Sequence, residues 1–351
     1  RVLFRSRGLT AWRGRGRRNL RICASDLLRT RLHRGGHLDV VVVGHLEVIV
    51  IVRRVDRVAR HGSVRSRRAS RGVWRPRRTC PRRFQNFIST VLGHFINWLP
   101  LKRNRISKVN IDLCFKDLDQ KDRDNIHKKN TIEFAKVIFD TGISWFWSDI
   151  RIKKNIPYKI NGLELLLRYQ RLNNGVLLFF KHSLHLELDS RIIAMNAEIF
   201  GVERKHNSTY FESIQKNGRL KSMKGVADRN STVSFVRWLK NGKTVLYAPD
   251  QNYGIKRSDE IDFFGLPAAT ISAPLKIITK TGCNYLFMNT YYKENCLIID
   301  IEEPKFSPAS SIMFMQELNK YIEDKIKLNP EEYLWQHRRF KSTLGKEKIY
   351  K

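Results

Sequence analysis

The chain has 351 residues, of which 42% are apolar, enough for the core of one large domain or two ordinary ones. Its formal net charge of +34 predicts acidic partners, such as nucleic acid or an anionic membrane surface. The five cysteines form no C-x-x-C pair and show no metal-ligand spacing, so no metal site is expected.

The charge is unevenly distributed along the chain. Residues 1–83 contain 24 arginines, no lysine and four acidic residues, whereas residues 84–351 contain 14 arginines, 29 lysines and 29 acidic residues. A change in the base composition of the coding DNA explains this switch more simply than protein physics does. We therefore interpret residues 1–83 as a non-native translation or a disordered segment, with a basic nucleic-acid-binding arm as the alternative. The apolar run at 40–52 is too short to span a bilayer as a helix and is either a strand or part of a misread frame.

Amphipathic helices are the first elements predicted after this segment. Residues 84–100 place apolar side chains at helical spacing and lead into a basic stretch, which predicts either an interfacial helix on an anionic membrane or an ordinary surface helix. Residues 122–146 predict one or two further helices. The aromatic run Trp145-Phe146-Trp147 is interpreted as core or as a membrane-interface cluster. We assign residues 84–150 to membrane-proximal helices.

Strands and helices alternate in the rest of the chain. Strands are predicted at 176–181, 199–204, 244–248, 284–292 and 297–302. Helices are predicted at 163–172, 186–198, 210–216, 231–239, 270–281 and 311–328. This alternation predicts an α/β fold for residues 151–345, a layered domain with a mixed, largely parallel central sheet flanked by helices, followed by a tail at 346–351.

A histidine stands where the strand at 176–181 ends. His182 is followed five residues later by Glu187, in the first turn of the next predicted helix. In one continuous helix the two side chains would point apart, so they meet only if the backbone turns between them, as it does at a strand-to-helix junction. The pair predicts a general base, His182, oriented by Glu187. A chance match of this spacing is the alternative.

Four further charged residues are candidates for the site. Asp250 is interpreted as a group that orients Arg219 or another base, or as a turn residue. Arg219 is predicted either to bind an anion such as a lipid phosphate or to be a surface arginine at a helix end. Arg338 and Arg339 are predicted phosphate contacts or part of a solvated basic end.

Several spaced motifs are characteristic of one family when they occur in this order. They are His182…Glu187, Gly218-Arg219-Leu220, Tyr247-Ala248-Pro249-Asp250, Phe263-Phe264-Gly265 and Tyr333-Leu334-Trp335 with His337-Arg338-Arg339-Phe340-Lys341. Through them, residues from about 84 to 345 resemble the late acyltransferases of lipid A biosynthesis, the lauroyl and myristoyl transferases of Gram-negative bacteria. The resemblance implies a glycerolipid-acyltransferase-like fold of the lysophospholipid acyltransferase superfamily.

The resemblance also implies an activity. An acyl chain would pass from an acyl carrier protein thioester to a hydroxyl of a lipid A precursor without a cofactor. His182 and Glu187 would be catalytic, and Arg219 and Asp250 would support them. The implied partners are acyl carrier protein, the lipid A precursor and the anionic inner membrane at its cytoplasmic face, and not nucleic acid. Asn252 and Gln336 depart from the family's pattern, and its amino-terminal membrane helix has no counterpart in residues 1–83.

Two other functions stay open from the sequence. One is an acyltransferase of the same superfamily that acts on a lysophospholipid or another glycolipid. The other is a basic nucleic-acid-binding protein that uses residues 1–83.

Overall fold

In the computed structural model, the chain forms two compact units. The described residues are 31–32, 36–43, 48–54, 82–206 and 208–350. The units are Arg1–Val41 with Val50–Gly62, and Val42–Ile49 with Ser63–Lys351. Most of the arginine-rich segment therefore lies outside the described residues. Its described part is a small sheet of three strands, β1 (Arg31–Leu32), β2 (Gly36–Val43) and β3 (Val48–Arg54).

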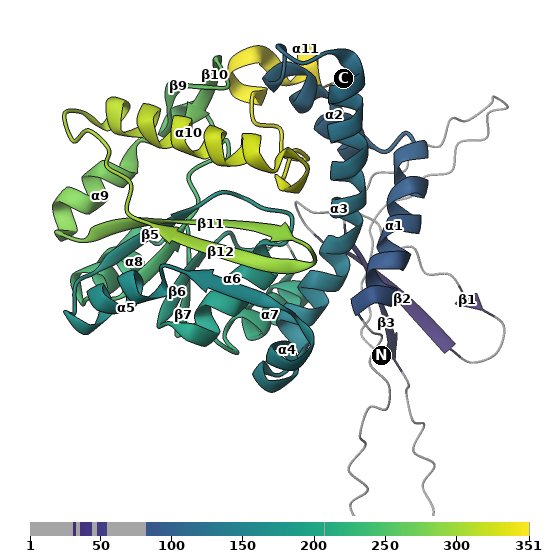
Figure 1. The fold of residues 1–351 in the computed structure, drawn as a ribbon, viewed down its shortest axis with the longest axis horizontal. Helices are drawn as coiled ribbons and strands as arrows, with labels where there is room; N and C mark the ends of the chain where they lie inside the picture. Colours follow the sequence, from purple (N-terminus) through teal and green to yellow (C-terminus); the bar gives the residue numbers. More distant parts are fainter. Residues whose placement is uncertain (1–30, 33–35, 44–47, 55–81, 207, 351) are drawn as a thin grey trace, which may run out of the picture. The chain divides into compact units, whose positions relative to one another are not determined.

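A seven-stranded sheet forms the centre of the larger unit. Its order is β4-β12-β11-β5-β8-β6-β7, and five strands run parallel while β4 and β12 run the opposite way (Figure 1). The strands are β4 (Tyr158–Asn161), β5 (Val176–Phe180), β6 (Ile199–Glu203), β7 (Gly225–Asp228), β8 (Thr244–Tyr247), β11 (Asn284–Lys293) and β12 (Cys296–Glu302). The predicted α/β class with a mixed, largely parallel sheet is confirmed.

Helices cover both faces of this sheet. They are α1 (Arg82–Trp98), α2 (Lys102–Cys114), α3 (Gln120–Phe146), α4 (Asp149–Asn155), α5 (Leu163–Arg171), α6 (Leu186–Asn196), α7 (Thr209–Arg219), α8 (Thr232–Lys240), α9 (Ala273–Thr281), α10 (Ser311–Leu328) and the short α11 (Lys346–Ile349). A separate hairpin is formed by β9 (Asp259–Phe263) and β10 (Leu266–Thr270). Figure 1 shows α10 above the strands and α4 and α5 below them.

Strand β5 is apolar throughout because it is buried on both faces. Leu177 and Phe179 belong to one core cluster, shared with residues of α8, α9 and α10. Val176, Leu178 and Phe180 belong to a second cluster, shared with residues of α4, α5 and α6. Alternate side chains of a strand point to opposite faces, so one strand anchors both cores. The end of β5, where His182 follows, is therefore a rigid position.

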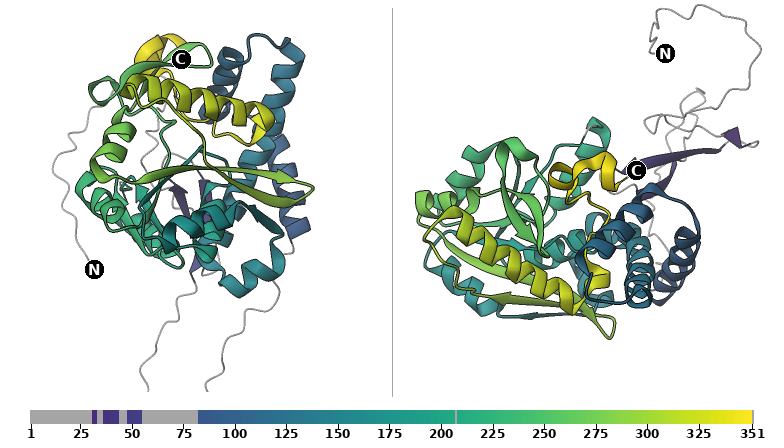
Figure 2. Two further views of the ribbon diagram at one scale, coloured as in Figure 1. Left: turned by 60° about the vertical axis from the view of Figure 1, so that its left-hand side comes forward. Right: turned by 90° about the horizontal axis from the view of Figure 1, so that it is seen from above.

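Helix α1 packs on α3 through small and polar residues. Gln85, Ser89 and Gly93 are buried, and a Cβ atom on Gly93 would lie 2.5 Å from Ile132 Cα, so the two helices approach closely. Figure 2 shows the two helices side by side in both views. Several large apolar residues of α1 are instead exposed, by 53% to 79% of their surface: Phe84, Phe87, Val91, Phe95 and Trp98. Within the described part of the chain, no helix has the length and apolar character needed to cross a membrane.

Several elements of the structure differ from the predicted ones. Strands β4 and β7 were not predicted, and both are edge strands of the sheet with only partly buried side chains. Helix α7 continues beyond the predicted end at Lys216 and ends at Arg219. Helix α9 begins at Ala273 because Thr270 pairs with Asp259 in the β9–β10 hairpin.

Candidate active site

The site begins where two neighbouring parallel strands end. β5 ends at Phe180 and β8 at Tyr247, and the two strands are paired in the sheet, so the loops that follow them meet at one edge. His182 Nδ1 lies 2.5 Å from Asp250 Oδ1, and the backbone N–H of His182 donates to Asp250 Oδ2 at 2.8 Å. The two residues therefore form a dyad that the sequence separates by 68 positions.

Asp250 determines which tautomer the neutral His182 ring adopts. Its side chain is fully buried, and burial alone would raise its pKa, but the charge and hydrogen bonds of His182, together with a hydrogen bond from Tyr333, lower the pKa to about 2. An ionised carboxylate only accepts hydrogen bonds, so the proton of the neutral imidazole lies on Nδ1. Nε2 then carries the lone pair that a general base uses.

Glu187 was predicted to orient the His182 ring, but its carboxylate contacts other residues. It lies in the first turn of α6, and its carboxylate accepts from Trp145 Nε1 at 2.8 Å and forms an ion pair with Arg219. Burial opposes ionisation of Glu187, but the charge and hydrogen bonds of Arg219 and the Trp145 hydrogen bond outweigh it and lower the pKa. The prediction that Glu187 orients the His182 ring is wrong, because Asp250 occupies that position.

Arg219 is held by two carboxylates. Besides the Glu187 pair, its Nη1 donates to Glu203 Oε2 at 2.5 Å. The residue before it allows this arrangement, since a Cβ atom on Gly218 would lie 2.5 Å from Trp145 Cγ. The structure therefore does not support the prediction that Arg219 binds an anion, because its guanidinium group already has two acidic partners.

The two arginines near the C-terminus have different surroundings. Arg339 is 3% exposed, and it donates to Ala269 O at 2.6 Å and to Thr270 Oγ1 at 2.5 Å. The predicted phosphate contact is thus wrong for Arg339, which ties the C-terminal segment to β10. Arg338 is half-buried, and its Nε atom is buried without a hydrogen-bond partner.

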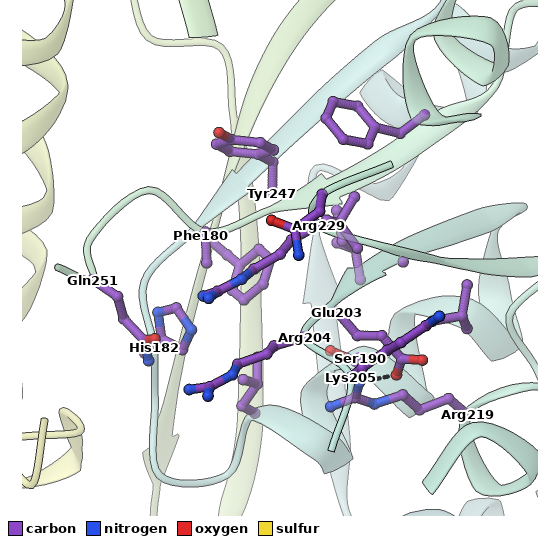
Figure 3. Close-up of a pocket in the computed structure, with 18 of the residues that line it drawn as sticks. Phe180, His182, Ser190, Glu203, Arg204, Lys205, Arg219, Arg229, Tyr247 and Gln251 are labelled. Atoms are coloured by element: carbon purple, nitrogen blue, oxygen red, sulfur yellow. Dashed lines mark hydrogen bonds and ion pairs between the residues drawn. The ribbon is translucent and has the colours of Figure 1, made fainter. Parts of the chain in front are cut away.

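A cavity of about 590 Å³ opens beside the dyad (Figure 3). One part of its wall is apolar or aromatic: Trp145, Phe180, Leu186, Met223, Val226, Phe235, Val236, Leu246, Tyr247, Ile271, Ile277 and Leu334. Another part is basic: Arg204, Lys205, Arg219, Arg229, Arg257, Lys276 and Lys280. Among the described residues that line it, the carboxylates are those of Glu187 and Glu203, and both are paired with Arg219. Such a wall suits a ligand with a long apolar part and an anionic part.

The C-terminal segment completes the loop that carries His182. Leu334 N donates to His182 O at 3.0 Å, and Leu184 N donates to Glu332 O at 2.8 Å, as in an antiparallel bridge. Two buried asparagines hold the same segment from α2 and α3. Asn110 donates to the carbonyls of Trp335 and His337, and Asn130 to those of Glu331 and Tyr333. This clamp was not predicted, although both asparagines lie on apolar helix faces.

A second histidine in this loop is part of a buried polar cluster. His185 Nδ1 lies 2.7 Å from Asp189 Oδ1, and its Nε2 lies 3.1 Å from Glu332 Oε2. Burial opposes the charged ring, but the two carboxylates outweigh it and raise the pKa of His185 to about 10. His185 is therefore a protonated structural residue, whereas His182 faces the cavity. The described residues contain no group of histidine, cysteine and acidic side chains suited to a metal ion.

Comparison with known proteins identifies one family. The family model for the bacterial lipid A biosynthesis acyltransferase matches residues 65–342. The lipid A biosynthesis palmitoleoyltransferase of Escherichia coli (strain K12) is 31% identical over 270 residues, covering 75% of this chain and 87% of that protein. The lauroyltransferase of the same organism is 30% identical over 249 residues, covering 69% and 80%. A lipid A biosynthesis acyltransferase of Haemophilus influenzae is 30% identical over 274 residues, covering 72% and 83%.

Proposed function

Because the chain belongs to the bacterial lipid A biosynthesis acyltransferases and is an O-acyltransferase, we propose that it moves a fatty acyl chain from an acyl carrier protein thioester to a hydroxyl of a lipid A precursor. The observation that carries the proposed chemistry is the His182–Asp250 dyad at the wall of a partly apolar cavity.

His182 acts as the general base in the proposed step. Nε2 accepts the proton of the acceptor hydroxyl as its oxygen attacks the thioester carbonyl carbon. Asp250 holds the ring and stabilises the imidazolium that forms, in the manner of the carboxylate of a hydrolase triad. Collapse of the tetrahedral intermediate breaks the C–S bond, and the proton returns from Nε2 to the leaving thiolate. The products are an ester and a free thiol, so the step needs no cofactor.

Glu187 supports this chemistry from the cavity wall. Its ion pair with Arg219, and that of Arg219 with Glu203, join α6, α7 and β6 beside the dyad. The Trp145 hydrogen bond adds α3 to the same group. Glu187 thus positions the wall against which the substrate lies, and its contribution to catalysis is indirect.

The apolar part of the cavity is the proposed site of the acyl chain. An extended chain of methylene groups gains roughly 0.8 kcal/mol for each group buried, so aromatic and aliphatic walls next to the base favour a fatty acyl donor. The surrounding basic residues suit an acidic carrier protein and a phosphorylated acceptor, because both are anionic.

We propose that the exposed face of α1 binds the anionic inner membrane at its cytoplasmic face. Phe87, Phe95 and Trp98 are exposed on the helix, and Lys102 and Arg105 follow at the start of α2. Apolar side chains beside basic ones are typical of a helix that lies in the interface of an anionic bilayer. This arrangement would bring the cavity to a lipid acceptor without a spanning helix in the described residues.

The test is transfer of radiolabelled acyl chain from acyl carrier protein to the lipid A precursor by purified protein in detergent. We expect His182→Ala to lower kcat by ~10² to 10⁴-fold, because the base is lost while the cavity is kept. The control is His94→Ala, an exposed histidine of α1 that does not line the cavity. Full activity of His182→Ala would contradict the mechanism, and transfer to a lysophospholipid in place of the lipid A precursor would contradict the proposed acceptor.

A further inference from the structure

Gln251 lies between two buried residues that hold its segment in place. Asp250 before it contacts both the ring and the backbone N–H of His182. Asn252 after it donates through Nδ2 to Arg339 O at 3.0 Å. Asp250 and Asn252 are both buried, whereas Gln251 is half-buried and lines the cavity. Gln251 is therefore a rigid position on the cavity wall, next to the carboxylate of the dyad.

The side chain of Gln251 enters the cavity at the base. His182 lines the same cavity, and Figure 3 shows the Gln251 side chain extending toward the His182 ring. Within the part of the chain that the structure describes, the Gln251 amide has no hydrogen-bond partner. Amide groups that are shielded from water are normally hydrogen-bonded, so this one is available to donate to a ligand in the cavity.

The proposed reaction needs a hydrogen-bond donor beside the base. When the acceptor oxygen attacks, the carbonyl oxygen of the thioester becomes an oxyanion, which preorganised N–H groups stabilise. Several N–H groups around the base already have acceptors within the protein. They are the backbone N–H groups of His182, Leu184 and Asn252 and the indole N–H of Trp145, which donate to Asp250, Glu332 O, His337 Nε2 and Glu187 respectively.

We propose that the side-chain amide of Gln251 donates to the oxyanion of the tetrahedral intermediate. The inference rests on the proposed function and adds a catalytic residue to it. As the new C–O bond forms, the acceptor proton moves to His182 and the carbonyl oxygen takes the negative charge and accepts from the Gln251 N–H. Collapse returns the charge to the leaving sulfur, which takes the proton from His182. A neutral amide suits this place because, unlike a lysine or arginine, it does not oppose protonation of the neighbouring imidazole.

The test compares the wild type with Gln251→Met and Gln251→Glu in the acyl-transfer assay. Methionine has a similar length and no donor, and an ionised glutamate has a similar shape but only accepts hydrogen bonds. We expect kcat to fall about 10²-fold or more in both variants, with KM nearly unchanged. The pH at which kcat is half-maximal should not change in Gln251→Met, because the base and its carboxylate are intact.

The matched control is Gln316→Met, which changes an exposed glutamine of α10 outside the cavity. Thermal unfolding of each variant shows that the fold is retained. Wild-type kcat in Gln251→Met would overturn the inference and leave the oxyanion to backbone N–H groups. Wild-type kcat in Gln251→Glu would overturn it too, because a group that only accepts would then suffice. So would an equal loss in the control, or a Gln251→Met variant that changes only KM or shifts the pH profile.

Binding of dodecylboronic acid tests the donor without turnover. Its boron takes up the oxygen of a water, the released proton passes to His182, and the anionic tetrahedral boronate resembles the intermediate. Tryptophan fluorescence measures the binding, since Trp145 lines the cavity. We expect Gln251→Met to weaken binding about tenfold or more and Gln316→Met to leave it unchanged. Absent binding, or equal affinity in the wild type and Gln251→Met, would overturn the inference. A wild type that binds the boronate through Gln251 but transfers no acyl chain would contradict the proposed function and leave this inference standing.

Discussion

His182 and Asp250 form the dyad because each follows a buried strand and the two strands are neighbours. Asp250 contacts both the ring and the backbone N–H of His182, so it fixes the orientation of the base as well as its tautomer. Glu187 is equally well ordered but is directed to Arg219 and Trp145. Two carboxylates near one histidine thus have separable roles, one acting on the base and the other on the cavity wall.

We expect Asp250→Asn to lower kcat by ~10² to 10⁴-fold, because an amide can hydrogen-bond the wrong tautomer of His182.

Glu187→Gln should instead lower the stability of the fold. Removing one member of a buried ion pair leaves Arg219 less compensated and costs on the order of 3 kcal/mol of unfolding free energy. The measurements are the pH profile of kcat and urea unfolding for each variant. A profile that changes for Glu187→Gln and not for Asp250→Asn would restore Glu187 as the partner of the base.

At the scale of secondary-structure elements, the buried polar cluster around His185 holds the loop after β5 in place. Asp189 of α6 accepts from His185, from Ser183 and from Thr290 of β11, while Glu332 binds the other side of the His185 ring. The loop, the helix, a neighbouring strand and the C-terminal segment therefore share one buried charge network, which fixes the loop that presents His182.

This network predicts a pH dependence of stability. The pKa of His185 is about 10 in the folded protein, against an ordinary value of about 6.5. A raised folded pKa stabilises the protein fully below pH ~6.5, and the stabilisation is lost as pH rises toward 10. The ring faces Asp189, Glu332 and the edge of Tyr292, with Lys181 nearby. His185→Gln should lower the unfolding free energy by on the order of 3 kcal/mol at pH 6, with a smaller difference at pH 10. Urea unfolding across this range measures it, and a constant difference would contradict the protonated state.

Helix α1 gives a prediction about membrane binding. Phe87→Gln/Phe95→Gln should weaken binding to vesicles of phosphatidylglycerol and phosphatidylcholine roughly tenfold or more, because two exposed phenyl rings no longer enter the interface. The control is Leu172→Gln/Leu328→Gln, since these leucines are equally exposed but lie outside α1. Vesicle sedimentation gives the affinities. An equal loss in both variants would indicate non-specific membrane binding by exposed apolar side chains and not a docking helix.

The elements that could be predicted from the sequence were those buried in the sheet or facing a core. The continuous apolar run of β5 and the stripe of α10 are examples, since burial leaves a pattern in the sequence. Edge strands such as β4 and β7 leave little pattern, because one side is solvated. Asp250 was predicted to orient Arg219 or another base, but its pairing with His182 was not predicted, because β8 lies between β5 and β6 in the sheet although it follows β6 and β7 in the chain. Strand order depends on the packing of the whole domain, which a local motif does not encode.

At the scale of the whole molecule, the residues of the site and the arginine-rich segment lie in different parts of the chain. The dyad, the cavity and the C-terminal clamp all belong to residues 82–350, whereas residues 1–81 contribute 22 arginines and four acidic residues. Arg82 itself belongs to the enzyme, since it pairs with Asp140 and donates to Tyr292 at 2.9 Å. A deletion that ends before Arg82 therefore keeps these contacts.

We expect deletion of residues 1–81 to leave kcat and KM unchanged in detergent, because every residue assigned to the site is retained. Binding to double-stranded DNA at low salt should fall strongly, because neutralisation of phosphates by arginine supplies most of such binding. Acyl-transfer kinetics and filter binding measure the two effects. Loss of transfer together with unchanged DNA binding would instead favour a nucleic-acid function centred on residues 82–351.

The bridge between the His182 loop and residues 332–334 sets the order in which activity is acquired during synthesis. The strands that carry the dyad are made before the loop's backbone partners, Glu332 and Leu334, which follow Asp250 in the chain. A nascent chain that lacks them has the base and its carboxylate but no segment to hold the loop in place. We therefore expect chains that stop before Glu332 to be inactive, even when they contain the dyad and the cavity wall up to Lys280.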